Sequence, residues 1–192
     1  MAESEDNDIA LVTRIAEGDK VAFRILFETY GERVFRYAYR MVNDRSLAEE
    51  VTNDVMLEVW KGAHRFEGRS KASTWVLGIA RYLALNAIRG KQLVTVDLDV
   101  TPEAVDDQES NAIARDRATV KQKLRDALAK LSTDHREVVE LTFFHGYSYQ
   151  EVAEVMGCPE NTVKTRMFHA KKQLRQALKR AGLDGVALEA VR

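Results

Sequence analysis

Residues 146–172, GYSYQEVAEVMGCPENTVKTRMFHAKK, decide the fold of the C-terminal part of the chain. Ser148 and Glu151 have the spacing of a capping box, in which the two side chains satisfy the first backbone N–H groups of a helix. Gly157-Cys158-Pro159 should end that helix and start another, because Gly suits a helix C-terminus and Pro the first helical position. The pattern predicts a helix-turn-helix.

The second helix of this motif, expected from Glu160 to Arg180, has one apolar and one basic face. The apolar side chains recur at helical spacing: Val163, Met167, Ala170, Leu174 and Leu178. The same stretch contains seven Lys or Arg residues and one acidic residue. Phosphate is the natural partner of such a face, so we predict a DNA-binding helix. The alternative is a solvated amphipathic helix.

Two positions in this helix are suited to reading DNA sequence. Lys164 and Thr165 lie in its second turn, where a recognition helix reaches base edges in the major groove. Phe168 is placed to touch a thymine methyl group.

In the turn, Cys158 is expected to be a small packing residue, and a redox switch is the alternative.

The composition limits the other functions of the chain. Its 192 residues carry 29 Lys and Arg against 30 Asp and Glu, a net charge of −1, so DNA binding must depend on the pattern of charges. The single Cys excludes an internal disulfide and a Cys-rich zinc site, and the four His residues are scattered. We therefore expect no metal site. No stretch suggests a membrane span or a signal peptide, so a cytoplasmic protein is expected.

The periodicity of the whole chain predicts an all-α fold, with two small helical domains joined by an acidic flexible linker. The first domain is expected at 8–90 and the linker at 91–117, where acidic residues dominate and large apolar groups are few. The second domain, 118–182, contains the helix-turn-helix. No alternating run is long enough for a convincing strand.

Helix boundaries in the first domain follow from Gly residues and from capping residues. Breaks are expected at Gly18, Gly31, Asn43-Asp44, Gly62 and near Gly90. Asp19 is expected to cap one helix, and Ser46 with Glu49 to form the capping box of the helix at 46–62. In the second domain, Ser132 is expected to cap a supporting helix.

Three stretches closely resemble bacterial sigma factors of the extracytoplasmic-function (ECF) group. RFEGRSKASTWVLGIARYLALNAIRG (65–90) and residues 22–60 are similar to that family's region 2, and residues 131–174 to its region 4. The resemblance implies a dissociable, non-enzymatic subunit of RNA polymerase, with no catalytic residue and no cofactor. Such a subunit recognises the −10 and −35 promoter elements and promotes DNA melting for transcription initiation. It also implies a stress or envelope signal as inducer, and control by an anti-sigma factor.

The resemblance further implies three sets of contact residues. Contacts with core RNA polymerase are expected from the polar face formed by Glu50, Asn53, Asp54 and Glu58. The alternative is that this face is a solvated surface. The −10 element is expected to meet Phe66, Arg69, Ser70, Lys71, Trp75, Arg81, Tyr82, Asn86 and Arg89. The −35 element is expected to meet Ser148, Tyr149, Asn161, Lys164, Thr165, Arg166, Phe168, His169 and Lys172. Phe66 and Trp75 either wall a base pocket or support the loop.

Two positions depart from the family pattern. Tyr82 stands where many members have Asn, so the family's base preference at the −10 element does not transfer. His169 stands where Arg is common, which removes one charge expected at the −35 element.

The rival readings are a dimeric regulator with a receiver domain and a small DNA recombinase, and both require strands in the N-terminal half.

Overall fold

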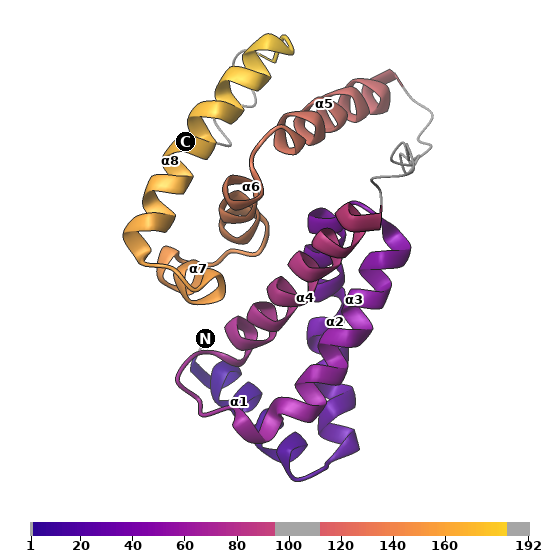
Figure 1. Ribbon diagram of the computed structural model, residues 1–192, viewed down its shortest axis with the longest axis vertical. Helices are drawn as coiled ribbons and strands as arrows, with labels where there is room; N and C mark the ends of the chain where they lie inside the picture. The colour runs from indigo at the N-terminus through magenta and orange to yellow at the C-terminus, as the bar shows by residue number, and fades with distance from the viewer. Residues whose placement is uncertain (1, 95–111, 184–192) are drawn as a thin grey trace. The chain divides into compact units, whose positions relative to one another are not determined.

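The computed structural model describes residues 2–94 and 112–183, and every regular element within them is a helix (Figure 1). The chain divides into an N-terminal unit built on α1 to α4 and a C-terminal unit built on α5 to α8. The predicted all-α fold is therefore confirmed. Most of the predicted linker lies outside the described residues, and the exact domain limits remain predictions.

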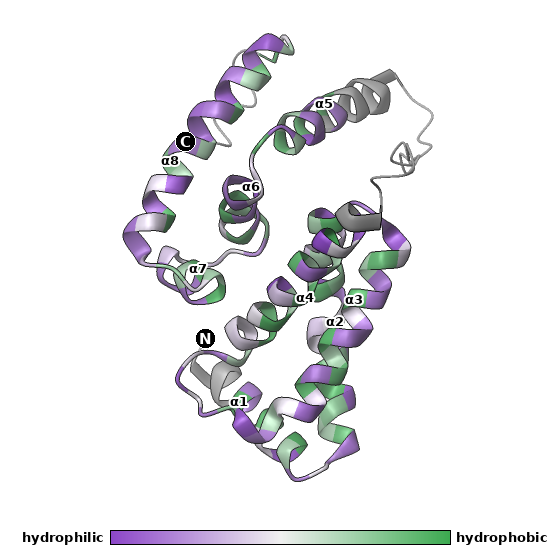
Figure 2. Cartoon of the chain, viewed as in Figure 1, coloured by the Kyte–Doolittle hydropathy of each residue, from purple (hydrophilic) through white to green (hydrophobic). Residues whose placement is uncertain are grey.

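Four helices form the N-terminal unit: α1 (Ala2–Ala16), α2 (Lys20–Val42), α3 (Arg45–Gly62) and α4 (Ala72–Val94), with a short 3-10 helix, η1 (Ala63–Arg65), after α3. Helix α2 packs against each of the other three. The side chains of Leu26, Tyr37, Val55 and Val76 are fully buried between them. Burial of each such apolar side chain contributes about 1.5 to 3 kcal/mol. In Figure 2 hydrophobic and hydrophilic stretches alternate along these helices, as amphipathic packing requires.

Helix α2 is continuous, so the prediction of a break at Gly31 was wrong. Gly31 has no positive φ and is buried inside the helix. A Cβ atom at this position would lie 3.3 Å from Cε1 of Phe27, one turn earlier, so the glycine makes room for that ring. An interior Gly costs about 1 kcal/mol relative to Ala. The burial of Leu26, Tyr30 and Val34 on the same helix offsets that cost.

The start of α3 also differs from the prediction. Asp44 is the N-cap, and its carboxylate accepts a hydrogen bond from the backbone N–H of Leu47 at 3.1 Å. Ser46 lies inside the first turn, and Glu49 pairs with Arg45 at 3.1 Å, so the predicted Ser46–Glu49 capping box was wrong. Asp is as good a cap as Ser, and Asp44 directly follows the left-handed residue that ends α2.

Helix α4 runs past Gly90 to Val94. Gly90 keeps a helical conformation, because it is not among the positive-φ glycines. Just beyond it, Lys91 Nζ lies 3.0 Å from Oδ2 of Asp44, which ties the last turns of α4 to the start of α3. The expected end near Gly90 was therefore wrong by about one turn.

The C-terminal unit contains α5 (Ala112–Ala129), α6 (Thr133–Val139), a π-helical turn η3 (Glu140–Phe144), α7 (Tyr149–Met156) and α8 (Glu160–Arg180). Helix α5 begins before residue 118, because the Ala- and Arg-rich start of this stretch favours a helix. Ser132 caps α6 as predicted, accepting from the backbone N–H of His135 at 3.4 Å. None of the helices in the two described ranges is both long and apolar enough to cross a membrane.

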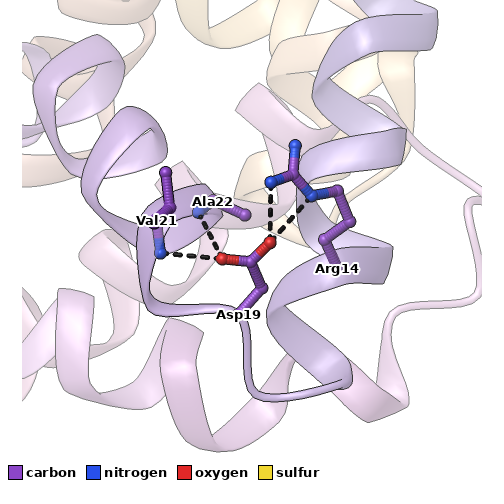
Figure 3. Close-up of polar contacts among 4 residues, drawn as sticks. All are labelled: Arg14, Asp19, Val21 and Ala22. Carbon is purple, nitrogen blue, oxygen red and sulfur yellow. Dashed lines mark hydrogen bonds and ion pairs between the residues drawn. The ribbon is translucent and has the colours of Figure 1, made fainter.

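Asp19 caps α2 as predicted and also holds α1 (Figure 3). Its Oδ1 accepts from the backbone N–H groups of Val21 at 2.8 Å and Ala22 at 3.1 Å. Its Oδ2 accepts from Nε and Nη2 of Arg14 at 2.9 and 2.6 Å. The hydrogen bond from Ala22, followed by the one from Arg14, holds the pKa of Asp19 below its usual 3.8.

A lowered pKa predicts how the stability of the fold depends on pH. The folded state favours the charged carboxylate, so its contribution is complete above the unfolded pKa and is lost as pH falls through the folded pKa. The stability difference between the parent and Asp19→Asn should therefore shrink steadily as pH falls from about 5. Urea unfolding between pH 7 and pH 3 measures it, with Glu28→Gln, an exposed carboxyl on the same helix, as control. A difference that does not change with pH would contradict the prediction.

Candidate nucleic-acid interface

The helix-turn-helix is built as its sequence predicts. The backbone N–H of Ser148 donates to Glu151 Oε2 at 2.8 Å, and the backbone N–H of Glu151 donates to Ser148 Oγ at 3.3 Å, which confirms the capping box. Gly157 adopts a φ of 61°, and the backbone N–H of Cys158 donates to the carbonyl of Ala153 at 3.0 Å. This left-handed turn ends α7. Pro159 occupies the N-cap of α8 and not its first helical position, a small correction.

Helix α8 presents the two faces expected of it. The five predicted apolar residues, Val163, Met167, Ala170, Leu174 and Leu178, are all buried. The predicted contact residues on the opposite side are all exposed: Asn161, Lys164, Thr165, Phe168, His169 and Lys172. Phe168 is 66% exposed, which is unusual for a large apolar side chain and leaves its ring available to a ligand. The exposed face thus combines an aromatic ring, a hydroxyl group and cations.

The polar contacts on this face show which groups remain available. Lys164 pairs with Glu160 at 2.8 Å, but both side chains are about half exposed, so the pair is weak. The hydroxyl of Thr165 donates to the carbonyl of Asn161 at 2.9 Å, which leaves its oxygen lone pairs as acceptors. Ser148 is exposed but engaged in the capping box, and Tyr149 is half-buried at the start of α7.

Arg166 differs from the other predicted −35 contacts. Its Nη2 lies 2.5 Å from Oδ2 of Asp134 on α6, and its Nη1 lies 3.7 Å from the sulfur of Cys158. The side chain is only 26% exposed. Arg166 therefore ties the recognition helix to its supporting helix. Cys158 is half-buried beside this guanidinium, and its role, packing or a redox switch, stays a prediction.

A histidine missed by the sequence reasoning adjoins the exposed face. The ring of His135 on α6 stacks on that of His169 at 6.2 Å between centroids, and Phe168 meets His169 edge-on at 5.5 Å. The two histidines are far apart in the sequence, and no spacing pattern indicated that they would meet.

The loop from η1 to α4 brings two predicted aromatic residues together. The rings of Phe66 and Trp75 lie 4.9 Å apart and both are half-buried. The loop turns at Gly68, whose φ is 68°, and Arg69 pairs with Glu67 at its exposed tip. The remaining predicted residues of the loop, Ser70 and Lys71, are half-buried. The aromatic pair thus joins the two ends of the loop without being fully buried, and its role, as the wall of a base pocket or as a support of the loop, stays a prediction.

Most of the predicted −10 residues beyond the loop share one face of α4. Trp75, Tyr82, Asn86 and Arg89 follow one another at helical spacing, and none is buried. The buried side chains, among them Val76, Ala80 and Ala84, occupy the opposite face. Arg81 projects about 100° away from Tyr82 around the helix axis, so it borders this face.

The predicted polymerase face of α3 also forms one stripe. Glu50, Asn53 and Asp54 are exposed, whereas Glu58 is half-buried and lies 3.4 Å from Lys61. Val51, Val55 and Val59 are buried on the other side. Leu57, which the sequence reasoning missed, lies within the polar stripe and is 48% exposed. Leu57 follows Asn53 by four residues, about one helical turn, so the two side chains share a face of α3.

Nothing in the described parts of the chain suggests a metal centre, since no three His, Cys, Asp or Glu side chains gather in residues 2–94 and 112–183.

Comparison with known proteins identifies the family. Residues 26–94 match the Sigma-70 region 2 family model and residues 121–174 match Sigma-70, region 4. The chain is 30% identical to the RNA polymerase sigma-H factor of Pseudomonas aeruginosa, over 91% of this chain and 95% of that protein. It is 31% identical to the ECF RNA polymerase sigma factor SigX of Bacillus subtilis, over 80% of this chain and 82% of that protein.

Two solved structures share the fold. One is CnrH in complex with the cytosolic domain of CnrY, with a TM-score of 0.69 at 22% identity, covering 91% of this chain and 98% of that one. The other is the sigma factor RpoE in complex with the anti-sigma factor NepR from Bartonella quintana, with a TM-score of 0.64 at 23% identity, covering 82% and 96%.

An all-helical chain whose helix-turn-helix exposes a basic recognition face belongs to the helix-turn-helix class of DNA-binding proteins. Within that class, the chain belongs to the sigma-70 family, as a sigma factor of the ECF group. Sigma factors are transcription initiation factors and not enzymes, in agreement with the sequence-based expectation.

Proposed function

We propose that this sigma factor binds core RNA polymerase through the exposed stripe of α3, the −10 element through the 66–71 loop and α4, and the −35 element through α8. The observation that carries the proposal is that the predicted contacts on α3, on α4 and on α8 each share a face of their helix that is not buried, apart from the inward-turned Arg166 and the bordering Arg81. An acidic stripe suits a basic partner helix. A basic helix with exposed Lys164 and Thr165 suits the major groove.

Promotion of melting follows from the same arrangement. Opening a promoter needs no catalytic group, because unpaired bases that gain protein contacts offset their lost pairing and stacking. The Phe66–Trp75 pair and the exposed Tyr82 supply aromatic surfaces for such bases. We assign melting to the N-terminal unit and duplex recognition to α8.

We further propose that the protein acts in the cytoplasm and is held inactive by an anti-sigma factor until a stress or envelope signal arrives. Support comes from the RpoE structure of the same fold, which was solved with an anti-sigma factor bound. Pull-down of the tagged protein with candidate inhibitors, with and without core polymerase, tests whether such a partner competes with the polymerase.

The rival readings conflict with the N-terminal unit. A receiver domain or a recombinase catalytic domain requires a sheet, whereas residues 2–94 contain helices and no strand. Transcription in vitro with purified core polymerase across a promoter library tests the proposal and reads both promoter elements. Transcription that needs neither element would overturn it, as would tight promoter binding by the protein without the polymerase.

The exposed face of α8 allows base readout to be separated from phosphate contacts. Lys164→Ala and Thr165→Ala should each change discrimination at particular −35 bases, by about 1 to 3 kcal/mol if a good base contact is lost. Lys172→Ala, two turns further along, should weaken binding by a similar factor on every sequence, as expected of a phosphate contact. Holoenzyme binding to single-base variants of the −35 element measures both effects. Unchanged base profiles in all three variants would contradict the assigned face.

A further inference from the structure

Two histidines from different helices meet at the edge of the proposed DNA-binding face of α8. His169 of α8 is exposed, and its ring stacks on that of His135 of α6, with the ring centroids 6.2 Å apart and the ring planes inclined by 27°. The ring of Phe168 meets that of His169 edge-on at 5.5 Å. Aromatic rings at such separations attract each other in defined orientations. The imidazole of His169 is therefore oriented by two neighbouring rings while it stays accessible to solvent.

The two imidazoles differ in their capacity to carry an added proton. Nδ1 of His135 is buried and has no hydrogen-bond partner among the described residues. In a charged imidazole both ring nitrogens are donors, and a buried donor without an acceptor is unfavourable. His169 is exposed, so water can solvate a proton on its ring. Of the two rings, His169 is therefore the one that can become a cation without leaving a buried donor unpaired.

The charges around the pair are mostly positive. On α8, Arg166 and Lys172 lie about one turn on either side of His169. On α6, Asp134 and Arg136 flank the histidine of the pair, and Asp134 is already paired with Arg166 at 2.5 Å. Helix α5 also packs on α8, but around the last two buried leucines of α8, more than a turn beyond this site. In the free protein, the surroundings of His169 therefore oppose an added positive charge.

We propose that His169 binds a backbone phosphate of the −35 element in its protonated form, and that His135 is a positioning residue that holds the ring of His169 for this contact. Lys172, the predicted phosphate contact, is exposed about one turn further along α8, so a phosphate backbone is expected beside this part of the helix. A phosphate attracts a charged imidazole in a charge-assisted hydrogen bond. The inference rests on the proposed binding of the −35 element by α8.

This contact makes the binding of DNA depend on pH. Histidine is the side chain whose charge normally changes between pH 5 and 8. Because the complex holds a proton that the free protein tends to lack, binding takes up a proton, and by linkage the affinity rises as pH falls. Acidification within this range should therefore strengthen the grip of α8 on the −35 element.

The test measures the binding of holoenzyme, assembled from the full-length protein and core polymerase, at about pH 8 and about pH 6. Two promoter fragments are compared: one extends through the −35 element, and the other ends just downstream of it. The ratio of the two affinities removes effects of pH on the polymerase and on the −10 element. In the parent, this ratio should rise by about three- to tenfold towards the lower pH, since one coupled proton changes affinity by at most about tenfold per pH unit. The salt dependence of the ratio should also steepen at the lower pH, by about one released counterion.

Variants of the two histidines separate charge from packing. His169→Arg carries a fixed charge and should give a high ratio at both pH values, whereas His169→Gln should give a low ratio at both. His135→Phe keeps an aromatic ring that cannot titrate, so it should keep the parent's dependence on pH. His135→Ala removes the stacked ring and should lose most of that dependence. His64→Gln removes an exposed histidine of the N-terminal unit and is the matched control, which should behave as the parent does.

The outcomes separate this inference from the proposed function. If the longer fragment binds no more tightly than the shorter one at either pH, the −35 assignment of α8 itself fails. If the longer fragment binds more tightly but the ratio is the same at both pH values, only the proton-linked contact fails. A dependence on pH that survives in His169→Gln would place the proton elsewhere and overturn the inference. Its loss in His135→Phe would make His135 the titrating group, and its persistence in His135→Ala would remove the positioning role.

Discussion

Replacing Asp54 and Glu58 together by lysine should weaken binding to core RNA polymerase by about a hundredfold or more. The two carboxylates lie on the outward face of α3, opposite the buried Val55 and Val59. If this stripe meets basic polymerase helices, the reversal places like charges against each other, which costs several kcal/mol, and about 3 kcal/mol corresponds to a factor of more than a hundred. Titration of labelled protein with purified core polymerase measures the change.

Glu28→Lys is the matched control for this reversal. Glu28 is an exposed acid of α2 in the same unit and does not belong to the α3 stripe. The Glu28→Lys substitution changes the net charge in the same direction and should leave core binding close to that of the parent. Leu57→Ala should weaken binding to a smaller degree, because it removes only apolar contact area. Equal behaviour of the double reversal and the control would mean that the stripe is a solvated surface.

Phe66→Ala should reduce open complexes on duplex promoters by about 5- to 150-fold, the range that corresponds to an aromatic base contact of 1 to 3 kcal/mol. The variant removes the ring that lies 4.9 Å from Trp75. Core binding should be unchanged, and a template with a pre-melted bubble at the −10 element should restore much of the activity, because unpairing no longer opposes binding. Lys71→Ala should show a smaller defect of the same kind. Permanganate footprinting on both templates measures opening.

Phe35→Ala controls for the general loss of an aromatic pair. Phe35 stacks on Tyr39 at 6.1 Å within α2, outside the loop. The Phe35→Ala variant should therefore open both templates as well as the parent does. Equal defects of Phe66→Ala on duplex and bubble templates, together with a lowered melting temperature, would mean that the loop has a structural role only.

The buried and exposed faces of the helices were predictable from the sequence, whereas most of the side-chain contacts between different helices were not. The buried stripe from Val163 to Leu178 follows from periodicity alone, as does the exposure of Lys164 and Thr165. Periodicity does not show where a side chain points once another helix offers a partner. Arg166 lies beside the buried stripe, three residues after Val163 and four before Ala170, but its partner, Asp134 of α6, is apparent only in the structure.

Glycines were the least predictable positions. Gly31 and Gly157 look alike in sequence, but only Gly157 adopts a positive φ and ends a helix. Gly31 remains helical because tertiary packing outweighs its low propensity. Asp44, and not Ser46, caps α3, and the same carboxylate pairs with Lys91 on another helix, a contact that no local pattern indicates.

The junction of Asp44 with Lys91 has a consequence for the entropy of binding. It joins the start of α3 to the last turns of α4, while both helices also pack along α2. The proposed polymerase-binding stripe of α3 and the proposed DNA-binding side of α4 are therefore parts of one preorganised body. A partner that meets an already ordered surface loses little affinity to the ordering of side chains and backbone. Engagement of the polymerase by α3 would then present α4 to the promoter without a folding step in between.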